Sequence, residues 1–152
     1  MALSLAFALC FISYGCLQSS RTSVETDVED EAVVAAKKVI SDGVKAENEQ
    51  CPIDFHNGLV YASATYDEEN NEINYNYSTT SFTMFEKGES ELKEFMLGTL
   101  VVACDNPQTK TFLEAVVKAR TKQIYTYKMD GQTRKIIILP SDLESNIPQL
   151  QR

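Results

Sequence analysis

A strict alternation of apolar and polar residues over positions 72–79 constrains the fold of this chain most. Ile73, Tyr75 and Tyr77 fall on one side of an extended segment, and polar residues fall on the other. A period of two residues is that of a β-strand with one buried and one solvated face, which is typical of antiparallel sheets. The chain is therefore predicted to contain an antiparallel sheet that packs on one face.

Two hairpins are expected around this strand. Residues 58–66 form a strand candidate that reaches 72–79 through the polar turn 67–71. Residues 123–129 and 134–139 form a second pair, joined by Asp130-Gly131, because these two residue types tolerate the positive φ angles of a type I′ turn.

The strand 134–139 differs from the others because its run Ile136–Leu139 is apolar on both faces. This pattern predicts a central position in the sheet. The alternative is an exposed edge that is open to strand addition. After Pro140, the tail 141–152 is expected to be loosely held.

Helical periodicity predicts the remaining elements. Residues 25–50 and 90–103 read as amphipathic helices, and a shorter helix capped by Thr109 or Thr111 runs to Arg120. The prediction is an α+β domain in the order α-ββ-αα-ββ, with a mostly antiparallel sheet of about four strands covered on one face by helices.

The tyrosines of these strands allow two interpretations. They pack as cross-strand pairs beneath the helices, which we favour, or they form an aromatic binding surface. The residues concerned are Tyr61, Tyr66, Tyr75, Tyr77, Tyr125 and Tyr127.

The first sixteen residues form an uncharged apolar run that is too short to span a membrane and has the length of a secretory signal. We therefore predict a signal peptide at 1–16, a polar tether at 17–27 and a domain at 28–140. Gly15-Cys16 resembles a lipobox, so lipidation of Cys16 is expected; a soluble secreted protein and a buried helix are the alternatives. The expected location is outside the cytoplasm, in the periplasm, at the outer membrane or secreted.

Composition limits the partners. The chain carries 14 basic and 22 acidic residues, for a net charge of −8. Such a surface repels nucleic acid and anionic lipid headgroups. We expect no nucleic-acid partner, and membrane contact only through an anchor at Cys16.

Within the domain the cysteines are Cys51 and Cys104, a natural pair for one disulfide in an oxidising compartment. The competing interpretation is two buried thiols. His56 is the only histidine, so a metal site is not expected, and no cofactor is. His56 and Asp54 lack an accompanying nucleophile motif, so no catalytic residue is assigned.

Several short motifs together resemble known exported proteins. They are Cys51-Pro-Ile, Asn71-Glu-Ile-Asn-Tyr-Asn-Tyr77, Cys104-Asp-Asn-Pro, Ile124-Tyr-Thr-Tyr and Asp130-Gly131. The chain resembles small secreted or lipid-anchored bacterial proteins, many of them uncharacterised and from Bacteroides-like bacteria. It is also similar to the quorum-sensing-regulated virulence factor family. The resemblance implies export and an α+β fold, and it carries no catalytic residues.

The resulting functional expectation is a non-enzymatic binding module of the cell envelope, whose partner is a macromolecule or a surface glycan. The alternatives are a small secreted hydrolase and a structural accessory subunit of a surface complex. A deep pocket lined by Asp or Glu near His56 would indicate the hydrolase. A flat apolar patch of several hundred Å² would indicate a partner binder.

Overall fold

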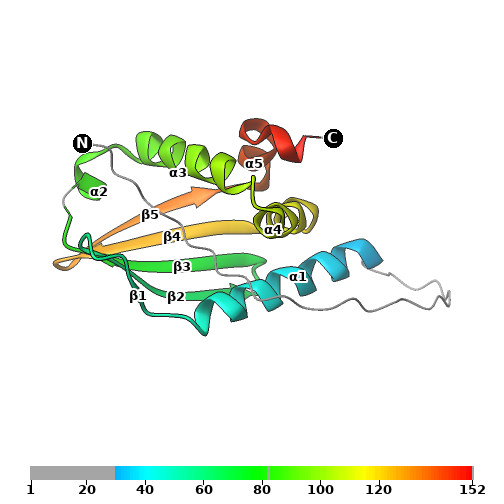
Figure 1. Cartoon of the computed structure of the whole chain (residues 1–152), viewed down its shortest axis with the longest axis horizontal. Helices are drawn as coiled ribbons and strands as arrows, with labels where there is room; N and C mark the ends of the chain where they lie inside the picture. Colours follow the sequence, from blue (N-terminus) through cyan, green and yellow to red (C-terminus); the bar gives the residue numbers. More distant parts are fainter. Residues whose placement is uncertain (1–29, 82, 152) are drawn as a thin grey trace.

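The computed structural model describes residues 30–81 and 83–151, in which helices pack over one face of a five-stranded sheet (Figure 1). In chain order the elements are α1 (Glu31–Asn48), β1 (Ile53–Asp54), β2 (Leu59–Asp67), β3 (Glu72–Thr79), α2 (Thr83–Glu86), α3 (Glu89–Ala103), α4 (Pro107–Lys118), β4 (Lys122–Met129), β5 (Gln132–Ile138), α5 (Pro140–Asn146) and the 3₁₀ helix η1 (Pro148–Leu150). The predicted α+β class is confirmed, with β1 added to the four predicted strands.

The predicted signal peptide 1–16, with Cys16, and the tether 17–27 lie outside the described residues. Within residues 30–81 and 83–151, no helix combines the length and the apolar character that crossing a membrane requires.

The strands are ordered β1-β2-β3-β4-β5 across the sheet. Three of the neighbouring pairs are antiparallel, whereas β3 and β4 run parallel. Parallel neighbours need a crossover connection, and α2, α3 and α4 supply it here. The sheet is therefore mostly antiparallel, as predicted, with one parallel pair at its centre.

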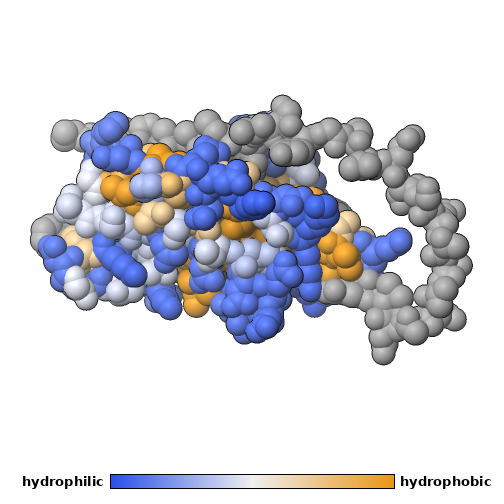
Figure 2. Space-filling model, turned by 90° about the horizontal axis from the view of Figure 1, so that it is seen from below, coloured by the Kyte–Doolittle hydropathy of each residue, from blue (hydrophilic) through white to orange (hydrophobic). Residues whose placement is uncertain are grey.

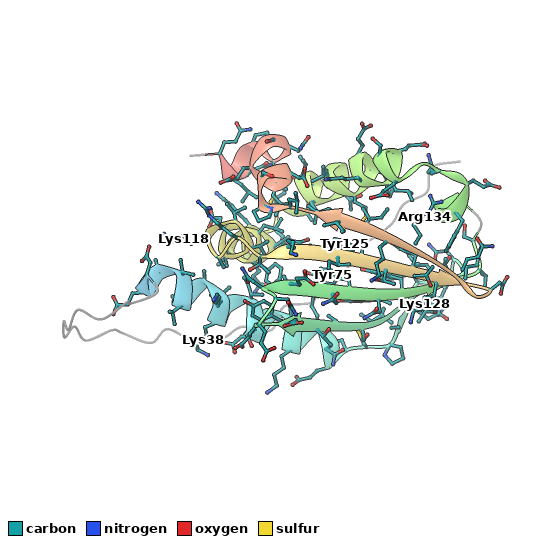
Figure 3. All side chains as sticks on the ribbon, turned by 180° about the vertical axis from the view of Figure 1, so that it is seen from behind. Lys38, Tyr75, Lys118, Tyr125, Lys128 and Arg134 are labelled. Carbon is teal, nitrogen blue, oxygen red and sulfur yellow. The ribbon has the colours of Figure 1, made fainter. Side chains whose placement is uncertain are left out.

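The alternation in β3 is confirmed: Ile73, Tyr75 and Tyr77 are all buried on the face that the helices cover. Register then brings tyrosines of β3 and β4 together. The rings of Tyr75 and Tyr125 stack at 4.7 Å and those of Tyr77 and Tyr127 at 5.0 Å. Figure 3 shows Tyr75 and Tyr125 side by side on their strands. These tyrosines belong to the core, as cross-strand packing predicts.

The turn between β4 and β5 has the predicted geometry. Asp130 and Gly131 have φ values of 46° and 78°. A type I′ turn requires a positive φ at both central residues, so the local sequence determines this hairpin.

The predicted central position of strand 134–139 is wrong, because β5 lies at the end of the sheet. Ile136 and Ile138 are fully buried on the helix-covered face, whereas Ile137 is 41% exposed on the opposite face. The same opposite face carries the exposed Lys135. An apolar residue on the solvated face of an edge strand made the run look buried on both sides.

The expectation of a loose tail at 141–152 is also wrong. Residues 140–146 form α5, and η1 follows directly. Leu143 and Ile147 are fully buried and Leu150 is nearly so. The segment is held because its apolar side chains pack against α3 and α4.

The N-cap residue of α4 differs from the prediction. Asn106, rather than Thr109 or Thr111, is the N-cap, and its Oδ1 accepts from the backbone N–H of Gln108 at 2.8 Å and of Thr109 at 3.4 Å. Pro107 takes the first helical position, where its missing N–H costs nothing. Thr109 is instead buried inside the helix.

We expect Asn106→Ala to lower the free energy of unfolding by about 0.5–2 kcal/mol, because two backbone donors of α4 lose their acceptor. Urea denaturation measures this loss. Thr111→Ala is the matched control, since the Thr111 hydroxyl only donates to the Pro107 carbonyl on the exposed surface. A larger loss of stability for Thr111→Ala than for Asn106→Ala would contradict the assignment of Asn106 as the N-cap.

Candidate functional site

The predicted Cys51–Cys104 disulfide is not present, because both thiols are free. Cys51 follows α1, and its Sγ donates to the carbonyl oxygen of Glu47 at 3.5 Å. Cys104 is buried at the end of α3. Helix α1 packs on β2 and helix α3 on β5, so the two helices lie over different parts of the sheet. The prediction assumed that the helix ends meet.

His56 and Asp54 lie together on the surface. The His56 ring is 3.6 Å from the Asp54 carboxylate, and the side chains are 88% and 59% exposed. Neither residue lines the cavity described next. Within the described part of the chain, no three His, Cys, Asp or Glu side chains are grouped as a metal site would require.

A cavity of about 50 Å³ lies between α1, α4 and the tyrosine-bearing face of the sheet. Its apolar wall includes Ile53, Phe55, Leu100, Phe112 and Leu113. Its polar lining is provided by Glu47, Gln50, Thr109 and Gln123, together with Tyr61, Tyr75, Tyr77 and Tyr125. We call this cavity the tyrosine pocket.

Glu47 enters the pocket because of its place on α1. Ala36, Ile40, Val44 and Glu47 are the buried residues of that helix, at intervals of three or four positions. The carboxyl group therefore stands where the helix otherwise buries apolar side chains. Only 8% of Glu47 is exposed.

Burial raises the pKa of Glu47 from 4.5 to about 7, although a hydrogen bond from Tyr61 partly opposes this increase. The Tyr61 hydroxyl donates to Glu47 Oε2 at 2.9 Å. Burial and the nearby Glu47 carboxyl in turn raise the pKa of Tyr61. A carboxyl group in this environment carries either a proton or a poorly solvated charge near neutral pH.

Gln123 is the second polar group of interest in the pocket. It is the inward-facing residue at the start of β4 and is 1% exposed. Its Oε1 accepts from the Tyr125 hydroxyl at 2.6 Å, while its Nε2 has no hydrogen-bond partner within the described residues. Buried amide groups are nearly always paired, so an unpaired one beside a cavity points to a missing partner.

Neither Glu47 nor Gln123 was singled out by the sequence analysis. The signals were present: Glu47 continues the apolar stripe of α1, and Gln123 shares the inward face of Tyr125 and Tyr127. Both are polar residues at positions that periodicity assigns to the core.

The comparisons with known proteins bear on the fold. No family model matches the chain, and no curated protein matches it. The similarity to the quorum-sensing-regulated virulence factor family and to Bacteroides-like proteins therefore remains a resemblance of short motifs.

A solved structure from Pseudomonas aeruginosa, described as a "putative secreted protein", matches with a TM-score of 0.52 at 11% identity. The match covers 74% of this chain and 96% of that one. At this identity it shows a common fold.

Proposed function

We propose that this protein is a non-enzymatic binding module that acts outside the cytoplasm, and that the tyrosine pocket receives a small ligand or one small group of a larger ligand. Export is supported by the uncharged apolar run at residues 1–16 and by the description of the Pseudomonas protein as secreted. Anchoring through a lipidated Cys16, in the periplasm or at the outer membrane, is part of this proposal.

The observation that carries the binding function is the pair of buried polar groups in the pocket. Glu47 accepts a hydrogen bond from Tyr61 but has no ion pair among the described residues, and Gln123 Nε2 has no hydrogen-bond partner among them. Desolvating such groups without full pairing costs free energy. Ligand sites have this composition: a mostly apolar wall with a few polar groups that fix the orientation of the ligand.

A binding role also fits the surface. Figure 2 views the molecule from below and shows small hydrophobic patches scattered among hydrophilic side chains on that side. A broad apolar patch would have favoured docking of a large partner there. The tyrosine pocket is the better candidate for recognition.

A hydrolase is supported less well. The Cys51 thiol, which interacts with Glu47, has its pKa raised by burial and by that carboxyl group, whereas a nucleophilic cysteine needs a lowered pKa. The only histidine, His56, is exposed on the surface and is not among the residues that line the pocket.

Cell fractionation tests export. We expect the protein in the envelope or the medium, and acyl labelling that disappears in Cys16→Ala. The control Cys51→Ala should keep the label, because Cys51 belongs to the folded domain. A full-length cytoplasmic product would contradict export, and equal labelling of both variants would remove the anchor from the proposal.

A further inference from the structure

The polar groups of the tyrosine pocket limit the chemistry of its ligand. Within residues 30–81 and 83–151, no Lys, Arg or His lines it and Glu47 forms no ion pair. Buried carboxylates are normally paired with a cation or a metal ion. Among the described residues, the ionised Glu47 therefore has no positively charged partner.

Tyr75 and Tyr77 line the same pocket, and the pKa of each hydroxyl is raised by burial, with Glu47 as a further cause. These hydroxyls stay neutral at physiological pH and can accept hydrogen bonds. An ammonium group brings three N–H donors, and the Glu47 carboxylate with the neighbouring Tyr61 hydroxyl offers oxygen acceptors for them. An anion would meet the Glu47 charge with no basic residue among the described pocket lining to offset it.

The Gln123 side chain indicates a second polar group in the ligand. Its amide is buried: Oε1 accepts from the Tyr125 hydroxyl, and Nε2 has no partner in the part of the chain that the structure describes. A hydroxyl group both donates and accepts, so it pairs with either end of an amide. A methyl group in that place would leave the amide unpaired.

From this arrangement we infer that the tyrosine pocket binds a small organic ammonium that carries a neighbouring hydroxyl group, with the ammonium at Glu47 and the hydroxyl at Gln123. The inference rests on the proposed function, in which the pocket is a ligand site. The net charge of −8 on the chain also attracts a cation at long range.

The volume of the tyrosine pocket limits the size of the ligand. A water molecule needs roughly 10–15 Å³ of such volume, so a cavity of about 50 Å³ accommodates about four non-hydrogen atoms. 2-Aminoethanol has this size and both groups. Ligands this small bind at best with dissociation constants of tens of micromolar, which suits titration by NMR.

The test is a ¹H–¹⁵N NMR titration of the protein at pH 8 with four probes of equal size: 2-aminoethanol, propylamine, 1,2-ethanediol and acetate. At this pH most of Glu47 is ionised. We expect 2-aminoethanol to shift the amides of pocket residues at the lowest concentration, propylamine to bind about 3- to 10-fold more weakly, and the two probes without an ammonium group at least 10-fold more weakly.

Three variants separate the contributions. Glu47→Gln should weaken both amines about 10-fold or more and leave 1,2-ethanediol unchanged. Gln123→Met should remove the preference for 2-aminoethanol over propylamine. Glu69→Gln, in the exposed turn between β2 and β3, is the control and should change nothing. The dispersion of each spectrum checks that the variant is folded.

The possible failures are distinct. If all four probes shift the pocket amides at similar concentrations, or if the neutral diol or acetate binds best, the ligand class is wrong and the pocket remains a binding site. If no probe shifts the pocket amides at concentrations up to about 50 mM, far above the dissociation constants expected for such ligands, and a library of other small molecules also leaves them unshifted, the proposed binding function is wrong as well.

Discussion

Replacing Glu47 by glutamine should stabilise the protein at pH 8 by about 3 kcal/mol and leave it nearly unchanged below pH 4.5. The folded protein raises the pKa of this carboxyl from 4.5 to about 7, and a pKa difference of one between the folded and unfolded states corresponds to about 1.4 kcal/mol. Glutamine has the same shape, keeps an acceptor for Tyr61 and never ionises. Urea denaturation of both proteins between pH 4 and 8 measures the difference.

The direction follows from proton binding. Between pH 4.5 and 7 the folded state holds a proton on Glu47 that the unfolded state has released, so wild-type stability falls as the pH rises across this range and levels off above about 7. The other titratable groups facing Glu47 are Cys51 and Tyr61, Tyr75, Tyr77 and Tyr125, all with raised pKa values, so they stay neutral over this range. Parallel pH profiles for wild type and Glu47→Gln, with Glu69→Gln as the exposed control, would contradict a buried Glu47 that has no positive partner among the described residues.

Leu143→Ala should lower the free energy of unfolding by about 2–5 kcal/mol, because Leu143 is fully buried beneath α5 and its removal leaves a cavity. Deleting residues 140–152 should cost more, since Ile147 and Leu150 are lost as well. Urea denaturation measures both losses, and Glu144→Ala on the exposed side of α5 is the matched control. If the deletion variant is as stable as the wild type, residues 140–152 do not contribute to the packed core, and the prediction is wrong.

The elements that could be predicted are those that local chemistry determines. The alternation of Ile73, Tyr75 and Tyr77 identifies β3 and its buried face, and Asp130-Gly131 identifies the second turn. Both signals act within a few residues, so they need no knowledge of the neighbours.

The failures concern tertiary context. The apolar run of β5 indicates hydrophobic residues but not their place in the sheet. Only the strand order shows that β5 is an edge strand, and only the packing shows that Ile137 lies on its solvated face. Likewise, Cys51 and Cys104 end two helices, but the pairing of their thiols depends on where those helices cross the sheet.

The candidate site was partly visible in the sequence. The tyrosines were assigned to the core, and Tyr61, Tyr75, Tyr77 and Tyr125 are buried there. That the same tyrosines also line a cavity depends on how α1 and α4 pack over them. Glu47 became a candidate only when its burial was known.

One measurement tests the central claim, that the tyrosine pocket holds a buried carboxyl group with no cationic partner among the described residues. The side-chain carboxyl carbons of glutamate, labelled with ¹³C, are followed by NMR from pH 3 to 9, and the Glu47 signal is assigned by its loss in Glu47→Gln. A midpoint at about 7 is the predicted result. A midpoint at or below the ordinary value of 4.5 would mean that Glu47 is solvated or already paired with a positive group, and would contradict the account.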